Sequence, residues 1–151
     1  LAQRDEALTH YRELLRLNPG DNQGARYACL NALLLMGRDD EAGTLLLQFG
    51  DEPSALWQYG WALWAFRREG DCPASRKRLR AAFRSNRHLP GYLTGDSEWA
   101  GPAPQSYAMG SREEAVICVD ELGDAWDATP GALEWLATHA PAGKSRKRHR
   151  R

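Results

Sequence analysis

The sequence lacks the features that define several large protein classes. Only three of its 151 residues are cysteines, and Cys29, Cys72 and Cys118 lie far apart without a C-x-x-C pair. An odd number of dispersed cysteines argues against a disulfide framework and favours reduced thiols, so we expect a cytoplasmic protein. No apolar run approaches the roughly 20 residues that cross a bilayer, and no signal peptide is present. We therefore expect no membrane partner.

Motifs for catalysis and cofactor binding are also missing. The sequence has no G-x-S-x-G, no phosphate-binding loop and no G-x-G-x-x-G. Its four histidines are scattered, and none lies at metal-ligand spacing from a cysteine or a carboxylate. Adjacent acids such as Asp39 and Asp40 stand where helices are predicted to begin, and the helix dipole explains them there. We expect a protein that is not an enzyme and that needs no cofactor or metal.

Charge is balanced in total but not along the chain. There are 20 basic and 20 acidic side chains. Residues 1–66 carry a net charge of −4, residues 67–95 carry +6, residues 96–143 carry −8, and residues 144–151 carry +6. Neutrality is therefore a cancellation between blocks of opposite sign.

Helical periodicity runs through most of the chain. Apolar residues at helical spacing, separated by Gly and Pro, predict helices over 5–17, 22–36, 39–49, 54–68 and 73–86. Residues 88–110 are rich in Pro and Gly and indicate a loop. Ser111 starts a capping box before a helix over 112–127, and Thr129-Pro130 predicts the start of another helix that ends near His139. The expected fold class is all-α.

A helix–turn–helix pattern recurs, most clearly over 31–42, where Gly37 separates two helices. A second pattern places a small residue, a large apolar residue, another small residue and Pro at offsets of 0, 4, 7 and 12. The matching positions are Ala7, Tyr11, Leu14 and Pro19, then Ser75, Leu79 and Ala82 with Arg87 in place of Pro. These spacings resemble the tetratricopeptide repeat (TPR), whose small residues let paired helices approach closely.

The TPR resemblance implies an architecture. It comprises a TPR-like α-α superhelix of about two and a half repeats over 1–87, the loop 88–110, two capping helices within 111–140 and a basic disordered tail over 141–151. Segments 11–19, 66–71 and 129–136 are further similar to bacterial TPR proteins related to the suppressor-of-tumorigenicity-seven family, a resemblance that implies a fold and no activity. The chain begins at Leu1 without Met, within helical periodicity, so we expect a segment of a longer protein.

Three tryptophans form the main candidate binding site. Trp57, Trp61 and Trp64 lie at i, i+4 and i+7 and so share one helix face. Alignment with the repeat places them on the wall of the inner groove of the superhelix. The equivalent positions of the preceding repeat are Tyr27, Asn31 and Leu34. This pattern predicts an aromatic groove for a peptide or a partner protein. Alternatively, the C-terminal helices fold back and bury the rings.

Basic residues form a second candidate site on the helix over 74–87. The stripe consists of Arg76, Lys77, Arg80, Arg84 and Arg87. It predicts binding of nucleic acid or an acidic partner, together with the basic tail over 144–151. The alternatives are a solvated outer face and pairing within the chain, to acids on the helix over 112–127. Those acids are Glu113, Glu114, Asp120, Glu121, Asp124 and Asp127.

Three functions follow from the sequence. The first is a non-catalytic protein–protein interaction module that binds through the inner groove. The second is a module that binds nucleic acid or an acidic partner through the basic stripe and tail. The third is a purely structural end of a larger solenoid. We also expect the first helix to expose an apolar face built on Leu8, Tyr11 and Leu15, through which the chain self-associates.

Overall fold

The protein is all-helical over the residues that the computed structural model describes, which are 2–20 and 24–141. In these ranges the chain forms α1 (Ala2–Leu17), α2 (Ala25–Leu35), α3 (Asp39–Gln48), α4 (Ala55–Glu69), α5 (Pro73–Ser85), α6 (Leu89–Thr94), α7 (Arg112–Ala128) and α8 (Ala132–His139). The predicted fold class, all-α, is confirmed for this part of the chain. None of these helices is long and apolar enough to cross a membrane.

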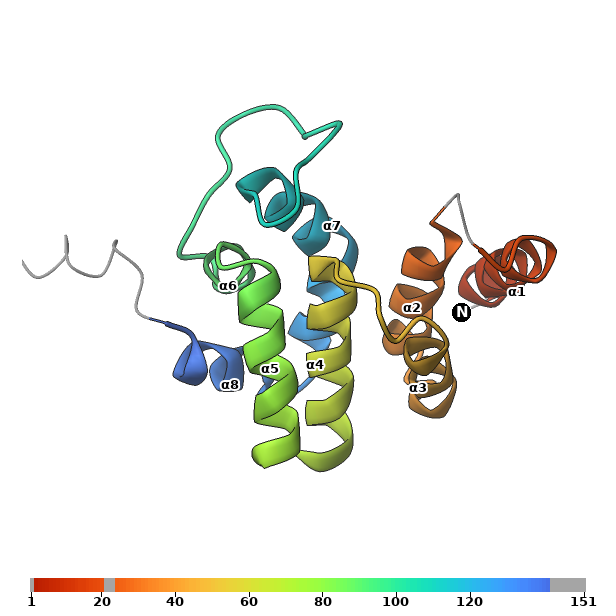
Figure 1. Cartoon of the computed structure of the whole chain (residues 1–151), viewed down its shortest axis with the longest axis horizontal. Helices are drawn as coiled ribbons and strands as arrows, with labels where there is room; N and C mark the ends of the chain where they lie inside the picture. Colours follow the sequence, from red (N-terminus) through yellow and green to blue (C-terminus); the bar gives the residue numbers. More distant parts are fainter. Residues whose placement is uncertain (1, 21–23, 142–151) are drawn as a thin grey trace, which may run out of the picture.

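The first five helices pack one on the next, with α1 at one end of the row (Figure 1). Helix α1 packs on α2, α2 on α3, α3 on α4 and α4 on α5, and α2 also contacts α4 directly. The turn between α2 and α3 is built on Gly37, whose φ of +70° is a left-handed conformation that glycine adopts without strain. The helix–turn–helix pattern around Gly37 is therefore present as predicted.

Helix α4 lies at the centre of the core. It contacts α2, α3, α5 and α7, and nine of its fifteen residues are buried. Gly60 shows how tightly α2 approaches, because a Cβ at this position would lie 2.7 Å from Cδ2 of Leu30. A helix that is apolar around its whole circumference has to be enclosed by neighbours. The sequence of α4 therefore requires its central position.

The C-terminal helices close the other side of the core. Helix α7 packs on α2, α4 and α6, and α8 packs on α6 and α7. Helix α6 lies inside the segment 88–110, which the sequence indicated as a loop. Its two leucines, Leu89 and Leu93, are buried, and the Asn86 side chain accepts hydrogen bonds from the backbone N–H groups of His88 and Leu89. A helix of six residues is too short to show a periodic pattern.

A buried carboxylate ties three helices together. Glu114 is only 3% exposed and accepts hydrogen bonds from the backbone N–H of Gly110 (2.8 Å), from Nδ2 of Asn86 (3.0 Å) and from the N–H of Ala55 (3.3 Å). The Asn86 carbonyl in turn accepts a hydrogen bond of 2.7 Å from the Tyr59 hydroxyl. The first turn of α4, the end of α5 and the first turn of α7 are thus joined through hydrogen bonds that burial makes costly to break.

The helix starts of the C-terminal region differ in part from the prediction. The Ser111 side chain accepts a hydrogen bond from the Glu114 N–H (3.1 Å), as a capping box requires, but the Glu114 carboxylate accepts from the N–H of Gly110 and not from that of Ser111. The prediction that Thr129 opens the last helix is wrong. Thr129 ends α7, where its hydroxyl donates to the Ala125 carbonyl, and α8 starts only after Gly131 at φ +80°.

Candidate functional site

The three tryptophans of α4 face other helices of the stack. Trp57 is fully buried and makes edge contacts with the rings of Tyr27 and Phe49, at centroid distances of 6.1 and 5.9 Å. Trp61 is buried, and the Arg78 guanidinium of α5 lies 3.7 Å from its ring centre. These two rings were expected to line an open groove. Burial between neighbouring helices removes both rings from any such surface.

Trp64 is half-buried between α3 and α4. Its Nε1 donates a hydrogen bond of 2.8 Å to the Asp39 carbonyl at the start of α3, and its ring lies 2.6 Å from where a Cβ on Gly43 would stand. The Arg68 guanidinium covers the ring at 5.1 Å. Trp64 is thus packed as a structural side chain by α3, because glycine at position 43 lets the two helices approach closely.

The three residues expected to continue the groove on α2 also lie against other parts of the fold. Leu34 is 2% exposed. The Tyr27 hydroxyl donates to the Glu52 carboxylate at 2.7 Å, and burial together with Glu52 raises the pKa of Tyr27. Asn31 is half-buried, and its Oδ1 has no hydrogen-bond partner among the described residues. The prediction that Leu34 lines an open groove is therefore wrong, since its side chain is core.

Helix α7 occupies the face that α2 and α4 share. Trp126 of α7 contacts Tyr59 of α4 at a centroid distance of 6.4 Å, and a Cβ on Gly60 would lie 3.9 Å from Cδ2 of Leu122. The alternative from the sequence was that the C-terminal helices fold back and bury the tryptophan rings. Helix α7 packs on α2 and α4, but Trp57, Trp61 and Trp64 contact Tyr27 of α2, Arg78 of α5 and Asp39 of α3. An i, i+4, i+7 pattern defines one face and leaves open which neighbour it meets.

The basic residues of α5 fall into two groups. Arg76 forms two bonds to the Asp71 carboxylate, at 2.7 and 2.8 Å, and Arg78 stacks on Trp61. The other four basic residues are exposed and have no hydrogen bond or ion pair among the described residues. These four, which we call the basic stripe, are Lys77, Arg80, Arg84 and Arg87. Lys77, Arg80 and Arg84, at i, i+3 and i+7, lie along one side of α5, and Arg87 follows the end of the helix at Ser85.

The acidic side chains of α7 do not neutralise this stripe. The sequence left open a pairing with Glu113, Glu114 and the acids that follow them, but over the described residues the ion pair of α5 joins Arg76 to Asp71 and none joins α5 to α7. Glu114 is buried in the network described above. The remaining exposed acids of α7, which we call the acidic stripe, are Asp120, Glu121, Asp124 and Asp127. The basic tail over 144–151 lies outside the described residues.

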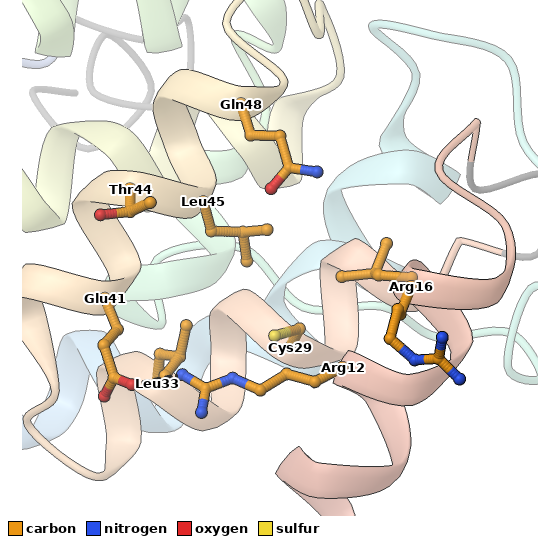
Figure 2. A pocket seen from close by; sticks show the side chains of 9 residues that line it. Arg12, Arg16, Cys29, Leu33, Glu41, Thr44, Leu45 and Gln48 are labelled. Carbon is orange, nitrogen blue, oxygen red and sulfur yellow. Dashed lines mark hydrogen bonds and ion pairs between the residues drawn. The ribbon is translucent and has the colours of Figure 1, made fainter.

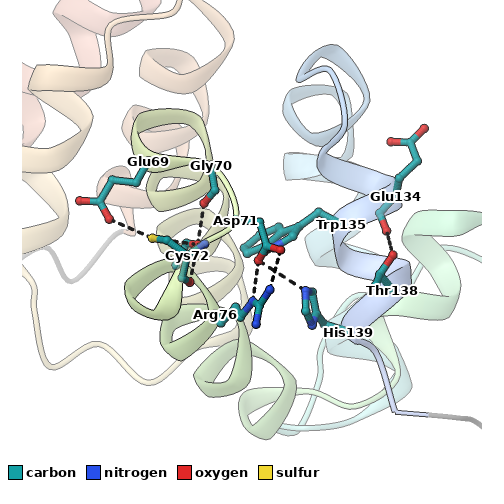
Figure 3. A network of polar contacts seen from close by, with 10 residues as sticks. Glu69, Gly70, Asp71, Cys72, Arg76, Glu134, Trp135, Thr138 and His139 are labelled. Carbon is teal, nitrogen blue, oxygen red and sulfur yellow. Dashed lines mark hydrogen bonds and ion pairs between the residues drawn. The ribbon is translucent and has the colours of Figure 1, made fainter.

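A polar network anchors α8 to the turn between α4 and α5 (Figure 3). Nε1 of Trp135 donates a hydrogen bond of 2.9 Å to Asp71, and Nε2 of His139 lies 3.5 Å from the same oxygen. The Arg76 guanidinium and the Trp135 N–H hold the pKa of Asp71 well below its usual range. The Trp135 ring also stacks on Phe66 at 4.6 Å. Asp71 therefore has a structural role, because three side chains from α5 and α8 share its carboxylate.

A cleft of about 440 Å³ between α1 and α3 has α2 as its floor (Figure 2). Its base is apolar, with Leu15, Leu33 and Leu45, and its rim carries an ion pair between Arg12 and Glu41. Sequence reasoning missed this cleft, because no local pattern reports the gap between two helices that both pack on a third.

The expected apolar face of the first helix is not exposed. Leu8 is 1% exposed, and Tyr11 and Leu15 pack against the core. Helix α1 thus uses these three side chains to pack on α2.

Metal-ligating side chains do not gather in the described part of the chain. No group of three His, Cys, Asp or Glu side chains in these ranges could hold a metal ion. Burial raises the pKa of the Cys118 thiol well above its usual value, which keeps this cysteine in its unreactive thiol form. A scan against protein-family models found no matching family, and searches of curated proteins and of solved structures found no match. The TPR resemblance therefore stays a prediction.

Proposed function

We propose that this chain is a non-catalytic protein-binding module that holds an acidic segment of a partner protein along the basic stripe of α5. The observation that carries this proposal is the exposure of Lys77, Arg80 and Arg84 on α5, and of Arg87 just after it, without a hydrogen bond or ion pair in the described residues. Three of the four are arginines, whose planar guanidinium groups bind carboxylates through two parallel hydrogen bonds.

A TPR-like stack is the architecture that we propose for α1 to α5. In such a stack the pairs α2–α3 and α4–α5 are successive repeats, and α1 is the second helix of a preceding one. The direct contact of α2 with α4 and the packing of α3 on α4 support this assignment. The inner groove would be lined by α2 and α4, and α7 packs against both. We therefore assign partner binding to α5 in place of the groove.

The charge of the described residues favours a protein segment over nucleic acid, although the whole chain has no net charge. The described residues carry 14 basic and 19 acidic side chains, a net charge of −5, so a long polyanion is repelled by most of the surface that they form. The stripe also has no aromatic side chain on which bases could stack. A short acidic segment contacts only the stripe and avoids both penalties.

The experiment measures binding of a synthetic helical peptide that carries glutamate at every third or fourth position. We expect the full chain to bind this peptide in fluorescence anisotropy. Replacement Arg80→Glu with Arg84→Glu should weaken binding at least about tenfold, because two attractive contacts become repulsive. The matched control is Arg4→Glu with Arg16→Glu on α1, which makes the same change in net charge and should retain the affinity.

Two further measurements separate the alternatives. The stripe variant should unfold at the same denaturant concentration as the unmodified chain, because exposed substitutions away from caps and core change stability by about 0.5 kcal/mol or less. A single-stranded DNA of equal charge should bind more weakly than the peptide. Stronger binding of the DNA, or an equal loss of peptide binding in the α1 control, would contradict the proposal.

A further inference from the structure

Two helix faces of opposite sign are left without partners in the described residues. One is the basic stripe on α5 and the other is the acidic stripe on α7, Asp120, Glu121, Asp124 and Asp127, all exposed. Neither stripe has an ion pair within the chain over the ranges described. Each is therefore free to meet a complementary surface.

The spacing of one stripe is the reverse of the other. Within α5, Lys77, Arg80 and Arg84 lie at i, i+3 and i+7, and Asp120, Asp124 and Asp127 of α7 lie at i, i+4 and i+7. When two helices with these stripes lie side by side and antiparallel, the three basic residues meet Asp127, Asp124 and Asp120 in turn. The parallel arrangement places only Arg80 and Arg84 opposite aspartates, because Arg87 follows the end of α5 at Ser85. The spacing therefore favours the antiparallel orientation.

The neighbouring positions fit the same antiparallel register. Ala81 would meet Gly123, so neither residue adds bulk between the helices. Arg76, which is bonded to Asp71, would meet Ala128 at the end of α7. The register that pairs the charges thus also brings no like charges together.

The stripes cannot meet within a single copy. Helix α5 packs on α4, α7 packs on α2, α4 and α6, and both are seen as separate helices around α4 in Figure 1. Hydrogen bonds from Ala55 and Asn86 to Glu114 hold the starts of α4 and α7 and the end of α5 in place. A contact between stripes therefore needs two molecules.

We propose that the acidic helix bound by the basic stripe includes α7 of a second copy of this chain. The contact joins different surfaces of the two copies, so it is head-to-tail, and repetition builds open chains unless the rotation closes a ring. Exposed ion pairs are individually weak, so association is expected only at high protein concentration and low salt. This inference rests on the proposed function, because both use the basic stripe.

A charge exchange tests the contact with the full chain in analytical ultracentrifugation. At about 20 mM salt the average mass of the unmodified chain should rise with concentration, and at about 300 mM salt it should return to that of one chain. Variant Arg80→Glu with Arg84→Glu has two acidic faces, and variant Asp120→Arg with Asp124→Arg has two basic faces. Each alone should stay a single chain. Their equimolar mixture should associate again, since each copy then offers the face that the other needs.

The outcomes separate this inference from the proposed function. Failure of the mixture to associate, or an unmodified chain that stays single at low salt, overturns the inference. The Asp120→Arg, Asp124→Arg variant keeps its basic stripe, so its binding of the glutamate peptide tests the proposed function by itself. Deletion of residues 142–151 should leave association intact. Loss of association on that deletion would show that the tail of a neighbour occupies the acidic stripe, and would overturn the inference.

Discussion

Helices α4 and α5 pack on each other but have opposite surroundings. Helix α4 is touched by α2, α3, α5 and α7, and nine of its fifteen residues are buried. Helix α5 packs mainly on α4, and four of its thirteen residues are buried. The side of α5 that faces away from α4 carries the basic stripe. One helix holds the fold together, and its neighbour presents charge to the solvent.

This difference separates stability from binding along the sequence. Apolar side chains that pack around α4 stabilise the fold because folding removes them from water, and the stabilisation from each one grows with the apolar area that it buries. Charges on the open side of α5 contribute little to folding, because water solvates them in both the folded and the unfolded chain. Substitutions in α4 should therefore change stability strongly, and substitutions in the basic stripe should change binding alone.

The largest effect is expected for Trp57→Ala. This ring is fully buried and contacts Tyr27 and Phe49, so its removal leaves a cavity between α2, α3 and α4. We expect the free energy of unfolding to fall by about 3–5 kcal/mol, measured by urea denaturation. Arg84→Ala on α5 is the control, with a change within about 0.5 kcal/mol. A similar fall in the free energy of unfolding of both variants would contradict the conclusion that α4 stabilises the fold and the open side of α5 does not.

A smaller effect is expected for Glu114→Ala. The substitution removes the acceptor of the buried Ala55 N–H and of the Gly110 N–H, and one of the two acceptors of Asn86 Nδ2, which keeps its bond to the Ser111 carbonyl. The free energy of unfolding should fall by about 2–3 kcal/mol. Glu113→Ala, at a half-buried residue without such bonds, should have little effect. Equal losses in the two variants would mean that the network does not hold α4 to α7.

The smallest effect is expected for Asp71→Asn, and it depends on pH. The Arg76 guanidinium and the Trp135 N–H lower the pKa of Asp71 in the folded chain. A carboxyl with a lowered folded pKa stabilises the fold above its ordinary pKa of about 3.9, and that stabilisation is lost as the pH falls below this value. The melting temperature of the variant should lie below that of the unmodified chain at pH 7.

The difference in melting temperature between Asp71→Asn and the unmodified chain should shrink as the pH falls from about 5 to about 2. Parallel thermal melts at several pH values followed by circular dichroism would measure it. A difference that stays constant across this range would show that the ionised carboxylate contributes nothing, and that α8 is held by the stacking of Trp135 on Phe66 alone. If Asp71→Asn destabilised the fold as much as Trp57→Ala does, this turn would contribute as much to stability as the core does.

The helices that the sequence predicted are those with long periodic patterns and clear ends. The segment predicted over 54–68 is Ala55–Glu69 in the structure, and that over 73–86 is Pro73–Ser85. Helix α6 was missed, because its six residues show no period and its cap comes from Asn86 outside the helix. The start of α8 was placed too early, since Thr129 bonds backward to α7.

The candidate sites could be predicted only as patterns. The tryptophan pattern correctly defined one face of α4, yet it did not show that this face meets Tyr27 of α2, Asp39 of α3 and Arg78 of α5. The basic pattern on α5 was visible in full. The sequence did not show that Arg76 pairs with Asp71, whereas Arg80 and Arg84 have no ion pair among the described residues.

The sequence by itself determined that the chain is helical, where its long helices begin and end, and which residues share a helix face. These properties depend on local periodicity, caps and the conformations of Gly and Pro, which act over a few residues. Only the tertiary structure decided that α7 covers α2 and α4, that Trp57 and Trp61 are buried, and that both charged stripes stay open. Which faces meet depends on shape and packing between residues far apart in the chain, and no local pattern contains that information.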